Sequence, residues 1–181
     1  QAEFMLSEEG RAQCRRLHER FHREDFHPTH IYSSLLGRAV ETAQIVTISW
    51  PVPIVYWHEL KELDFGIFTG LTWDEIGKKY PELVQEFQKS RDWDIVEGAE
   101  PMGLRRDRAR RAIEAVTQRH ANSDSVLMFT HGGILQYMVA ALMGTERTWG
   151  VDVRNTAVFE FTLDLKRWRL DGEGLHNNFL W

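Results

Sequence analysis

The chain has 181 residues, of which 43% are hydrophobic and 27% charged, and this suits one globular domain that buries roughly 70% of its unfolded surface. A formal net charge of -5 argues against a general nucleic-acid-binding protein, and the single cysteine, Cys14, excludes a disulfide framework. Because no apolar run approaches the roughly 18 residues of a membrane span and no signal peptide is visible, we expect a cytoplasmic protein.

Helix and strand signals alternate along the first part of the chain. Ser7 is a suitable N-cap and predicts a helix over residues 8–24. Residues 29–34 predict a short strand, and GRAVETAQIV (37–46) predicts a second helix with one apolar face. PIVYW (53–57) is typical of another strand. This alternation indicates an α/β protein.

The central part of the chain is mainly helical. Thr72 and Glu75 match a capping box, and Pro81 interrupts or restarts the helix that they open. A long amphipathic helix is predicted over residues 105–120. We interpret its five arginines as a solvated helix face rather than a phosphate site: Arg105, Arg106, Arg108, Arg110 and Arg111.

Four aromatic side chains of the central part could line the mouth of a site that accepts hydrophobic or sugar phosphates. We interpret them instead as side chains that pack against helices. They are Phe65, Phe68, Trp73 and Trp93.

The last part of the chain predicts a strand, a helix and a hairpin. VLMF (126–129) indicates a buried strand, and helical spacing resumes over residues 134–143. Residues 157–164 alternate between apolar and polar, and residues 168–170 predict a partner strand, so we expect an antiparallel hairpin on the edge of a mostly parallel sheet. Residues 1–181 therefore predict one domain, a three-layer α/β/α sandwich.

His131 stands between that buried strand and its helix, and two glycines follow it directly. Glycines in this place allow the backbone to approach a ligand, and the helix N-terminus offers N–H groups and a positive dipole to an anion. From this stretch alone, a histidine that merely caps the helix is an equally good interpretation.

Two further side chains follow predicted strands. Arg38 begins the helix after residues 29–34, and Glu62 follows PIVYW in the segment HELKELDFGIFTG. Each residue alone is explained as an ordinary solvated charge. With His131 they form a chemically meaningful set, because arginine binds phosphate oxygens through a planar fork, histidine is a second donor and a carboxyl group can be a general acid.

Three segments, SSLLGRAVETA, LKELDFGIFTG and FTHGGILQ, occur in this order and resemble the phosphatase-type branch of the histidine phosphatase superfamily, the phosphoglycerate-mutase-like enzymes. LSEEGRAQ at 6–13 resembles the first-helix signature of the family, and VRNTAVFEF at 153–161 resembles its late strand. The resemblance covers nearly the whole chain and implies the phosphoglycerate-mutase-like fold.

The resemblance also implies an activity, that of a phosphoric monoester hydrolase that uses no metal or other cofactor. A histidine nucleophile takes the phosphoryl group, and water then hydrolyses the phosphohistidine. Arg38 would bind the phosphate, and His131 would donate to a phosphate oxygen with the N–H of Gly132 nearby. Glu62 would protonate the leaving oxygen and later deprotonate the attacking water.

One departure from the family concerns the nucleophile. In the family it lies in an Arg-His-Gly triplet that ends the first strand, and no such triplet occurs in these 181 residues. In many members a glutamine or glutamate and a small residue follow the triplet, as Gln1 and Ala2 would here. We therefore expect the first strand and the nucleophile to lie just upstream of Gln1.

Two other functions stay open. A catalytically inactive family member would bind phosphorylated ligands or proteins through Arg38 and His131. A phosphoglycerate-type mutase is less favoured, because such mutases carry longer insertions, whereas Glu62 and His131 are 69 positions apart (131 − 62).

The expected partner is a small phosphorylated substrate, with no nucleic acid and no membrane. The sequence leaves the oligomeric state open, a dimer included. No dinucleotide or P-loop motif and no histidine spacing typical of a metal site is present, so we expect neither a nucleotide-binding module nor a bound metal.

Overall fold

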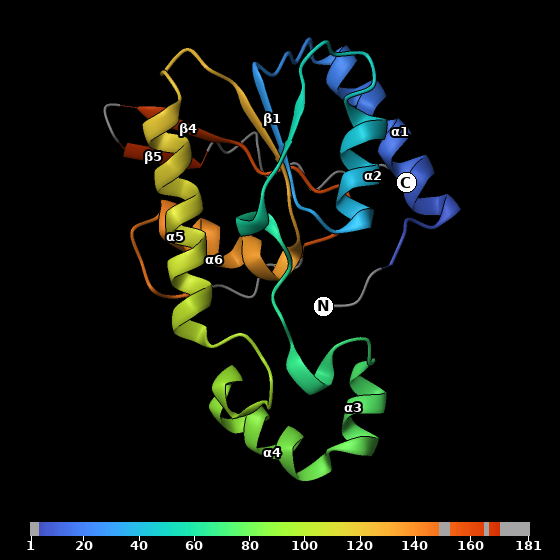
Figure 1. Cartoon of the computed structure of the whole chain (residues 1–181), viewed down its shortest axis with the longest axis vertical. Coiled ribbons are helices and arrows are strands. Elements are labelled where there is room, and N and C mark those ends of the chain that lie inside the picture. The colour runs from blue at the N-terminus through green and yellow to red at the C-terminus, as the bar shows by residue number, and fades with distance from the viewer. Residues whose placement is uncertain (1–3, 149–152, 165–166, 171–181) are drawn as a thin grey trace.

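Three short parallel strands form the sheet that positions the candidate site (Figure 1). The computed structural model describes residues 4–148, 153–164 and 167–170. The strands, in the spatial order β2-β1-β3, are β1 (His30–Ser33), β2 (Ile54–Tyr56) and β3 (Val126–Phe129). Because the strands are parallel, their carboxyl ends lie at one edge of the sheet, where open α/β sheets bind ligands.

Four helices cover the two faces of this sheet: α1 (Glu8–Arg23), α2 (Gly37–Val46), α5 (Met102–Arg119) and α6 (Gly132–Leu142). Successive side chains of a strand point to opposite faces. Ile31 packs in a core with residues of α1 and α2, whereas Tyr32 packs in a second core with residues of α5 and α6. Figure 1 shows α1 and α2 to the right of β1 and α5 and α6 to its left. The predicted three-layer α/β/α sandwich is confirmed.

Local sequence explains where these helices begin. The side chain of Ser7 caps α1 by accepting a hydrogen bond of 3.1 Å from the N–H of Gly10, as predicted. Helix α5 begins at Met102, three residues before the predicted start, because Pro101 is its N-cap. Among the residues that the structure describes, no helix has the length and apolar character needed to cross a membrane.

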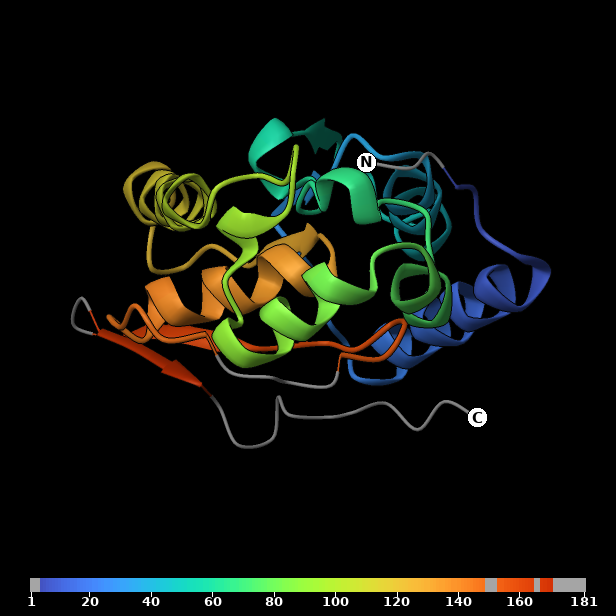
Figure 2. The same cartoon turned by 90° about the horizontal axis from the view of Figure 1, so that it is seen from below.

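A helical lobe lies at the lower end of the molecule in Figure 1, and faces the viewer in Figure 2. It contains α3 (Trp73–Lys79) and α4 (Pro81–Ser90). The predicted capping box of Thr72 and Glu75 opens α3, and Pro81 starts α4 as its first residue. Short 3-10 turns flank the lobe: η1 (His58–Leu60), η2 (Gly66–Phe68) and η3 (Trp93–Ile95).

The aromatic residues of this lobe pack against one another. Phe87 and Trp93 have ring centroids 4.6 Å apart, and Phe65 and Trp93 have centroids 5.0 Å apart. Phe68 is 3% exposed in the centre of this cluster. The packing interpretation is confirmed for these residues, whereas Trp73 packs on Phe87 but keeps 59% of its surface exposed.

The predicted hairpin consists of β4 (Phe161–Asp164) and β5 (Arg167–Leu170), which pair antiparallel. We expected this hairpin at the edge of the parallel sheet, but it forms a two-stranded sheet of its own. A period of two specifies a half-buried strand but carries no information about the strand with which it pairs, because pairing depends on tertiary packing. For the same reason residues 157–160, which continue the alternation, are not part of β4.

Candidate active site

His131 lies at the carboxyl end of β3 and at the N-cap position of α6. Its side chain does not cap the helix. Instead, its Nε2 atom lies 2.8 Å from Oγ of Ser34, which follows β1 directly. Both side chains are buried, with 9% of His131 and none of Ser34 exposed. The interpretation of His131 as a mere helix cap is therefore wrong, since the imidazole faces the neighbouring strand.

The environment of His131 favours its neutral form. Burial, together with the positive charges of Arg38 and Arg108, lowers the pKa of the imidazole from 6.5 to about 3. A neutral imidazole has one N–H donor and one acceptor nitrogen, so it can hydrogen-bond to an anion without itself being charged.

Arg38 is the second residue of α2 and is half-buried. His131 contacts Ser34, which lies four residues before Arg38, so both residues stand at the carboxyl edge of the sheet, and the charge of Arg38 helps to lower the pKa of His131. The structure thus brings two of the three predicted site residues together. Their combination, a guanidinium beside a neutral imidazole, suits a phosphate group.

Glu62 is bonded to the N-terminus of the helix that His131 begins. Its carboxylate accepts hydrogen bonds from the N–H of Gly133 at 3.3 Å and of Ile134 at 3.1 Å, and from that of Leu63 at 2.9 Å. We expected this helix N-terminus to receive an anion, and the structure shows that a carboxylate of the protein takes two of its N–H groups. Glu62, the third predicted residue, is therefore held close to His131 by hydrogen bonds to the first turn of α6.

The second glycine of the THGG segment is needed for this contact. A Cβ atom on Gly133 would lie 2.5 Å from Oε1 of Glu62 and 3.0 Å from Cδ1 of Leu63. A Cβ atom on Gly132 would meet only the side chain of Val153, at an ordinary distance of 3.6 Å. In this structure the space beside Gly133 is taken by a side chain of the protein, Glu62, and the approach of a ligand to these glycines stays a prediction.

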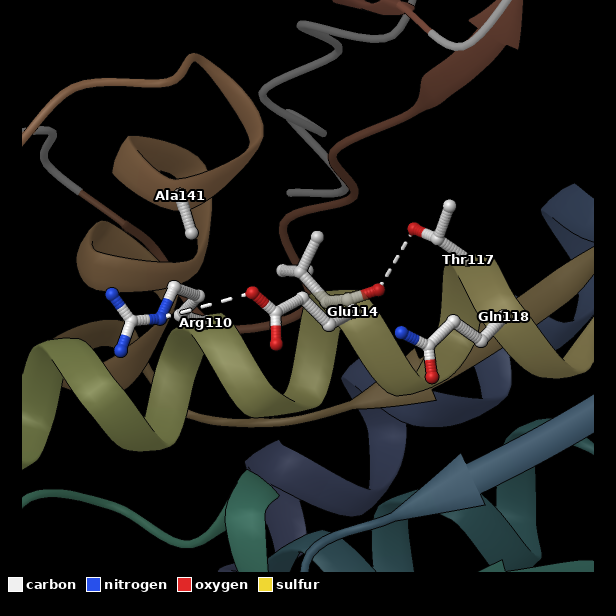
Figure 3. Close-up of a pocket in the computed structure, with 6 residues that line it drawn as sticks. Arg110, Glu114, Thr117, Gln118 and Ala141 are labelled. Carbon is white, nitrogen blue, oxygen red and sulfur yellow. Dashed lines mark hydrogen bonds and ion pairs between the residues drawn. The ribbon is translucent and has the colours of Figure 1, made fainter.

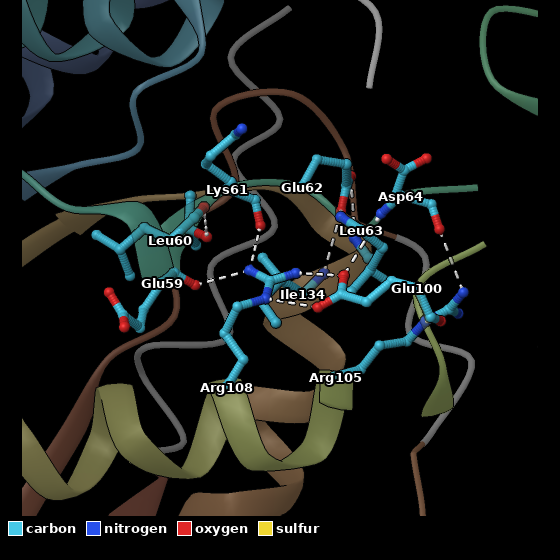
Figure 4. A network of polar contacts seen from close by, with 12 residues as sticks. Glu59, Leu60, Lys61, Glu62, Leu63, Asp64, Glu100, Arg105, Arg108 and Ile134 are labelled. Atoms are coloured by element: carbon cyan, nitrogen blue, oxygen red, sulfur yellow. Dashed lines mark hydrogen bonds and ion pairs between the residues drawn. The ribbon is translucent and has the colours of Figure 1, made fainter. Parts of the chain in front are cut away.

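A buried network of charged groups holds the segment that carries Glu62 (Figure 4). Arg108 of α5 donates from Nη1 to the backbone carbonyl oxygens of Glu59 at 2.8 Å and Lys61 at 2.7 Å. Its other donors reach the carboxylate of Glu100 at 2.8 and 2.7 Å. Such a bidentate pair fixes both partners, so the backbone on the N-terminal side of Glu62 is held in one position.

Arg105 extends the same network. Its side chain is fully buried, donates to the carbonyl oxygens of Glu100 at 2.6 Å and Asp64 at 3.3 Å, and lies over the ring of Trp93. The interpretation of the arginine run as a solvated face is wrong for Arg105 and Arg108. Both fall on the core side of α5, which a count of charges in the sequence does not reveal. Arg108 is satisfied by backbone carbonyls and the carboxylate of Glu100, whereas Nη1 of Arg105 has no hydrogen-bond partner among the described residues.

Sequence reasoning missed three contributors to this site. Ser34 is part of the SSLLGRAVETA segment but was given no role, and Glu100 and Arg108 were not connected with Glu62. A possible signal was the helical spacing, because Arg105 and Arg108 lie on the same side of α5 as the apolar Ala109 and Ala112.

A separate pocket of about 320 Å³ is lined by residues of α5 and by Ala141 of α6, and it contains none of the predicted site residues (Figure 3). Its lining residues are Arg110, Ile113, Glu114, Thr117, Gln118 and Ala141. Arg110 and Glu114, one turn apart on α5, form an ion pair of 3.8 Å. The candidate active site is therefore identified by its residues at the sheet edge, and this pocket is not part of it.

The fold and the site define an α/β protein with an arginine, a histidine and a glutamate gathered at the carboxyl edge of a parallel sheet. Residues 1–175 match the family model described as the histidine phosphatase superfamily, branch 1. The chain therefore belongs to the histidine phosphatase superfamily.

Individual relatives agree with this family. The chain is 31% identical to phosphoglycerate mutase-like protein 4 of Arabidopsis thaliana over 91% of this chain and 72% of that protein. It is 26% identical to phosphoserine phosphatase 1 of Hydrogenobacter thermophilus over 90% of this chain and 76% of that protein. The solved structure of YhfR from Bacillus stearothermophilus superimposes with a TM-score of 0.79 at 30% identity, covering 93% of this chain and 84% of that one. The relatives include phosphatases, which supports a hydrolase.

Proposed function

We propose that the protein hydrolyses phosphoric monoesters of small molecules in the cytoplasm through a phosphohistidine intermediate. The observation that carries the proposal is the grouping of Arg38, neutral His131 and Glu62 at one edge of the sheet. Two of these groups suit a phosphate, and the third suits proton transfer to an ester oxygen beside it.

Arg38 and His131 bind the phosphate in this mechanism. The guanidinium of Arg38 pairs with phosphate oxygens and stabilises the charge that they carry as the phosphoryl group is transferred. His131, placed by Ser34, donates a hydrogen bond from the imidazole or accepts one from a protonated phosphate oxygen. The N–H of Gly132, the first residue of α6, adds a backbone donor on the same side.

Glu62 transfers the protons of both steps. In the first step a histidine nitrogen attacks phosphorus, the bond to the ester oxygen breaks, and Glu62 gives its proton to that oxygen. In the second step water attacks the phosphohistidine, Glu62 takes a proton from the water, and phosphate and free histidine are released. The hydrogen bonds to Gly133 and Ile134 fix the direction in which the carboxyl group points.

The nucleophilic histidine is the part of the proposal that residues 1–181 do not supply, because no Arg-His-Gly triplet occurs in them. We place it in a first strand immediately before Gln1, within one histidine-phosphatase domain that includes residues 1–181. No step of this mechanism uses a metal ion.

A phosphatase is favoured over a mutase by the short connection between Glu62 and His131, although phosphoglycerate mutase-like protein 4 is among the relatives. The name of the second relative, phosphoserine phosphatase 1, indicates that a small phosphorylated metabolite is a suitable class of substrate.

The first test is the intact mass of the protein purified from its source, with tandem sequencing of any segment before Gln1. A mass above the 21.2 kDa of residues 1–181, with Arg-His-Gly joined to Gln1, is the expected result. An upstream strand with another residue in place of the histidine would contradict the phosphohistidine step.

The second test is Glu62→Gln in that complete protein. Turnover of alkyl phosphates, which are poor leaving groups, should fall by roughly 10² to 10⁴, whereas activated aryl phosphates should lose far less. Glu59→Gln is the matched control. It changes a carboxylate in the same segment, and Glu59 contacts Arg108 through its backbone carbonyl oxygen, which the substitution keeps. Equal losses with both ester classes would remove Glu62 from the proton-transfer role.

A catalytically inactive protein that binds phosphorylated ligands is the second candidate, and the position of Arg38 and His131 at one edge of the sheet supports it, because binding a phosphate requires no nucleophile. Calorimetric titration with inorganic phosphate separates the two. Saturable binding that needs Arg38, without turnover of any ester by the complete protein, would support the binding function.

A further inference from the structure

A second group of polar side chains lies at the opposite, amino-terminal edge of the same sheet. His30 is the first residue of β1, His120 is the C-cap of α5, and Asp124 lies in the connection that leads to β3. Since β1 has four residues, this group is separated from Ser34 by roughly 13 Å, the length of the strand.

The three side chains converge on a common point. One ring nitrogen of each histidine and one carboxylate oxygen of Asp124 all lie within 4.8 Å of one another. Nδ1 of His120 is 3.5 Å from Oδ2 of Asp124, and Nδ1 of His30 is 4.0 Å from the same oxygen. In a tetrahedral zinc site with bonds of about 2.0–2.1 Å, neighbouring ligand atoms lie at comparable separations of about 3.3 Å.

His120 supplies an independent indication of a ligand. Its side chain is only 8% exposed, and its Nδ1 atom is buried without a hydrogen-bond partner in the described part of the chain. This nitrogen faces the carboxylate of Asp124 at a distance too long for a good hydrogen bond. A buried polar atom without a partner is costly, and a cation between the nitrogen and the carboxylate would satisfy both.

The surrounding residues orient these groups as the outer shell of a metal site does. The hydroxyl of Tyr32 lies 3.0 Å from Nε2 of His120, so that Nε2 can carry the proton and leave Nδ1 with a free electron pair. Asp124 is held by the N–H of Ala121, which donates to Oδ2 at 2.9 Å. Both ligands are therefore positioned before a cation arrives.

His30 is the adjustable member of the group. Its side chain is 43% exposed and that of Asp124 is 23% exposed, so an ion and a water molecule can enter from solvent. Nδ1 of His30 lies 2.9 Å from the hydroxyl of Thr29. A modest rotation of this exposed ring would exchange that hydrogen bond for a metal bond.

We propose that His30, His120 and Asp124 bind a divalent transition-metal ion, with Zn²⁺ as the best match. Two imidazoles and one carboxylate form a donor set that suits zinc, and water completes the tetrahedron. The ion joins the end of α5 to the start of β1 and to the connection before β3. It stabilises the fold at the edge remote from Arg38 and Glu62, independently of the proposed phosphatase function.

No local pattern indicates this site, because its members come from residues 30 and 120–124, which only the parallel pairing of β1 with β3 brings together. The direct alternative is an ion pair between a protonated His120 and Asp124 without a metal. That alternative predicts no specific response to zinc.

The experiment is a calorimetric titration of the metal-free, complete protein with Zn²⁺, combined with thermal unfolding. The variants are His30→Ala and Asp124→Asn, because His120→Ala would also remove a buried ring that packs on Tyr32. Asp124→Asn keeps an oxygen that can accept from Ala121. The matched control is His27→Ala, which removes an exposed histidine near Asp25, outside the cluster.

One equivalent of zinc should bind the unaltered protein and the His27→Ala variant. At zinc 100-fold above the dissociation constant, the unfolding midpoint should rise by roughly 5–10 °C. His30→Ala and Asp124→Asn should weaken binding at least about tenfold and remove most of this rise. No saturable binding to the unaltered protein, or equal binding by Asp124→Asn, would overturn the proposal and favour the ion pair.

Discussion

Two histidines with buried side chains lie on either side of β3 in the chain, in opposite electrostatic surroundings. His131, at the carboxyl end, contacts the hydroxyl of Ser34 and is influenced by two arginines. His120, shortly before the amino end, contacts the hydroxyl of Tyr32 and faces the carboxylate of Asp124. Both imidazoles bond to a hydroxyl of the same neighbouring segment, β1 and the residue that follows it.

The difference between the two ends lies in the charge that surrounds each ring. Cations beside a neutral imidazole favour a bound anion, whereas a carboxylate beside an imidazole with a free nitrogen favours a bound cation. We therefore expect the same residue type to bind a phosphate at one edge of the sheet and a metal ion at the other. We expect the surrounding charges, more than the histidine itself, to decide which ligand each site binds.

The largest expected effect comes from removing a cation at the carboxyl edge. Arg38→Ala should lower kcat/KM for phosphate esters by roughly 10³, since the main partner of the phosphate oxygens is lost. It should also weaken binding of inorganic phosphate in calorimetry, while zinc binding at the other edge stays unchanged.

Arg106→Ala is the control for this prediction, because it removes an exposed arginine of α5. It should leave both phosphate and zinc binding as they were. If Arg38→Ala bound phosphate as tightly as the unaltered protein, Arg38 would not belong to the anion site.

The next effect tests how Glu62 is placed at this edge. In Gly133→Ala the new methyl group would lie only 2.5 Å from Oε1 of Glu62, so the carboxylate must move and lose its hydrogen bonds to α6. We expect kcat/KM to fall roughly 10²-fold. The free energy of unfolding should fall by about 1–3 kcal/mol, measured by denaturant titration.

Gly77→Ala is the matched control, since Gly77 is also helical and a Cβ atom there meets nothing within 4 Å. It should leave activity unchanged and raise stability slightly. Equal behaviour of the two variants would mean that Glu62 does not depend on the space beside Gly133.

The smallest effect is the pH dependence of stability, which tests whether the surroundings of His131 keep its imidazole neutral. The folded state lowers its pKa from 6.5 to about 3, so the unfolded chain binds more protons between these two values. The stability that neutral His131 contributes is complete above pH 6.5 and is lost as pH falls. At pH 5 the loss should be about 2 kcal/mol relative to neutral pH.

Unfolding of His131→Asn followed from pH 7 to pH 5 checks this prediction, since the variant should show a shallower loss of stability than the unaltered protein. His27→Asn, which removes an exposed histidine, should follow the unaltered protein. Parallel curves for His131→Asn and the unaltered protein would show that the imidazole is not held neutral.

Most of the fold could be predicted because local sequence patterns carry it. The predicted helix over 37–46 coincides with α2, and the predicted strand over 126–129 coincides with β3. The capping box at Thr72 is present as expected. Periodicity, caps and prolines act over a few residues, so their effect is readable without knowing the partners.

The placement of the hairpin and the arginines of α5 could not be predicted in the same way. The alternation from residue 157 indicated a strand but not its pairing partner. Arg105 and Arg108 look like surface charges in the sequence. Carbonyl groups of another segment accept hydrogen bonds from them and so offset part of the free-energy cost of burying their charges.

By itself, the sequence determined the order of helices and strands, the family and the identity of Arg38, Glu62 and His131 as candidates, because each depends on neighbouring residues in one segment. Only the tertiary structure decided that Glu62 bonds to α6, that Ser34 contacts His131, and that His30 meets Asp124. These contacts join residues more than 70 positions apart. They follow from the parallel pairing of β1 with β3 and from the packing of helices on the sheet, which no local pattern encodes.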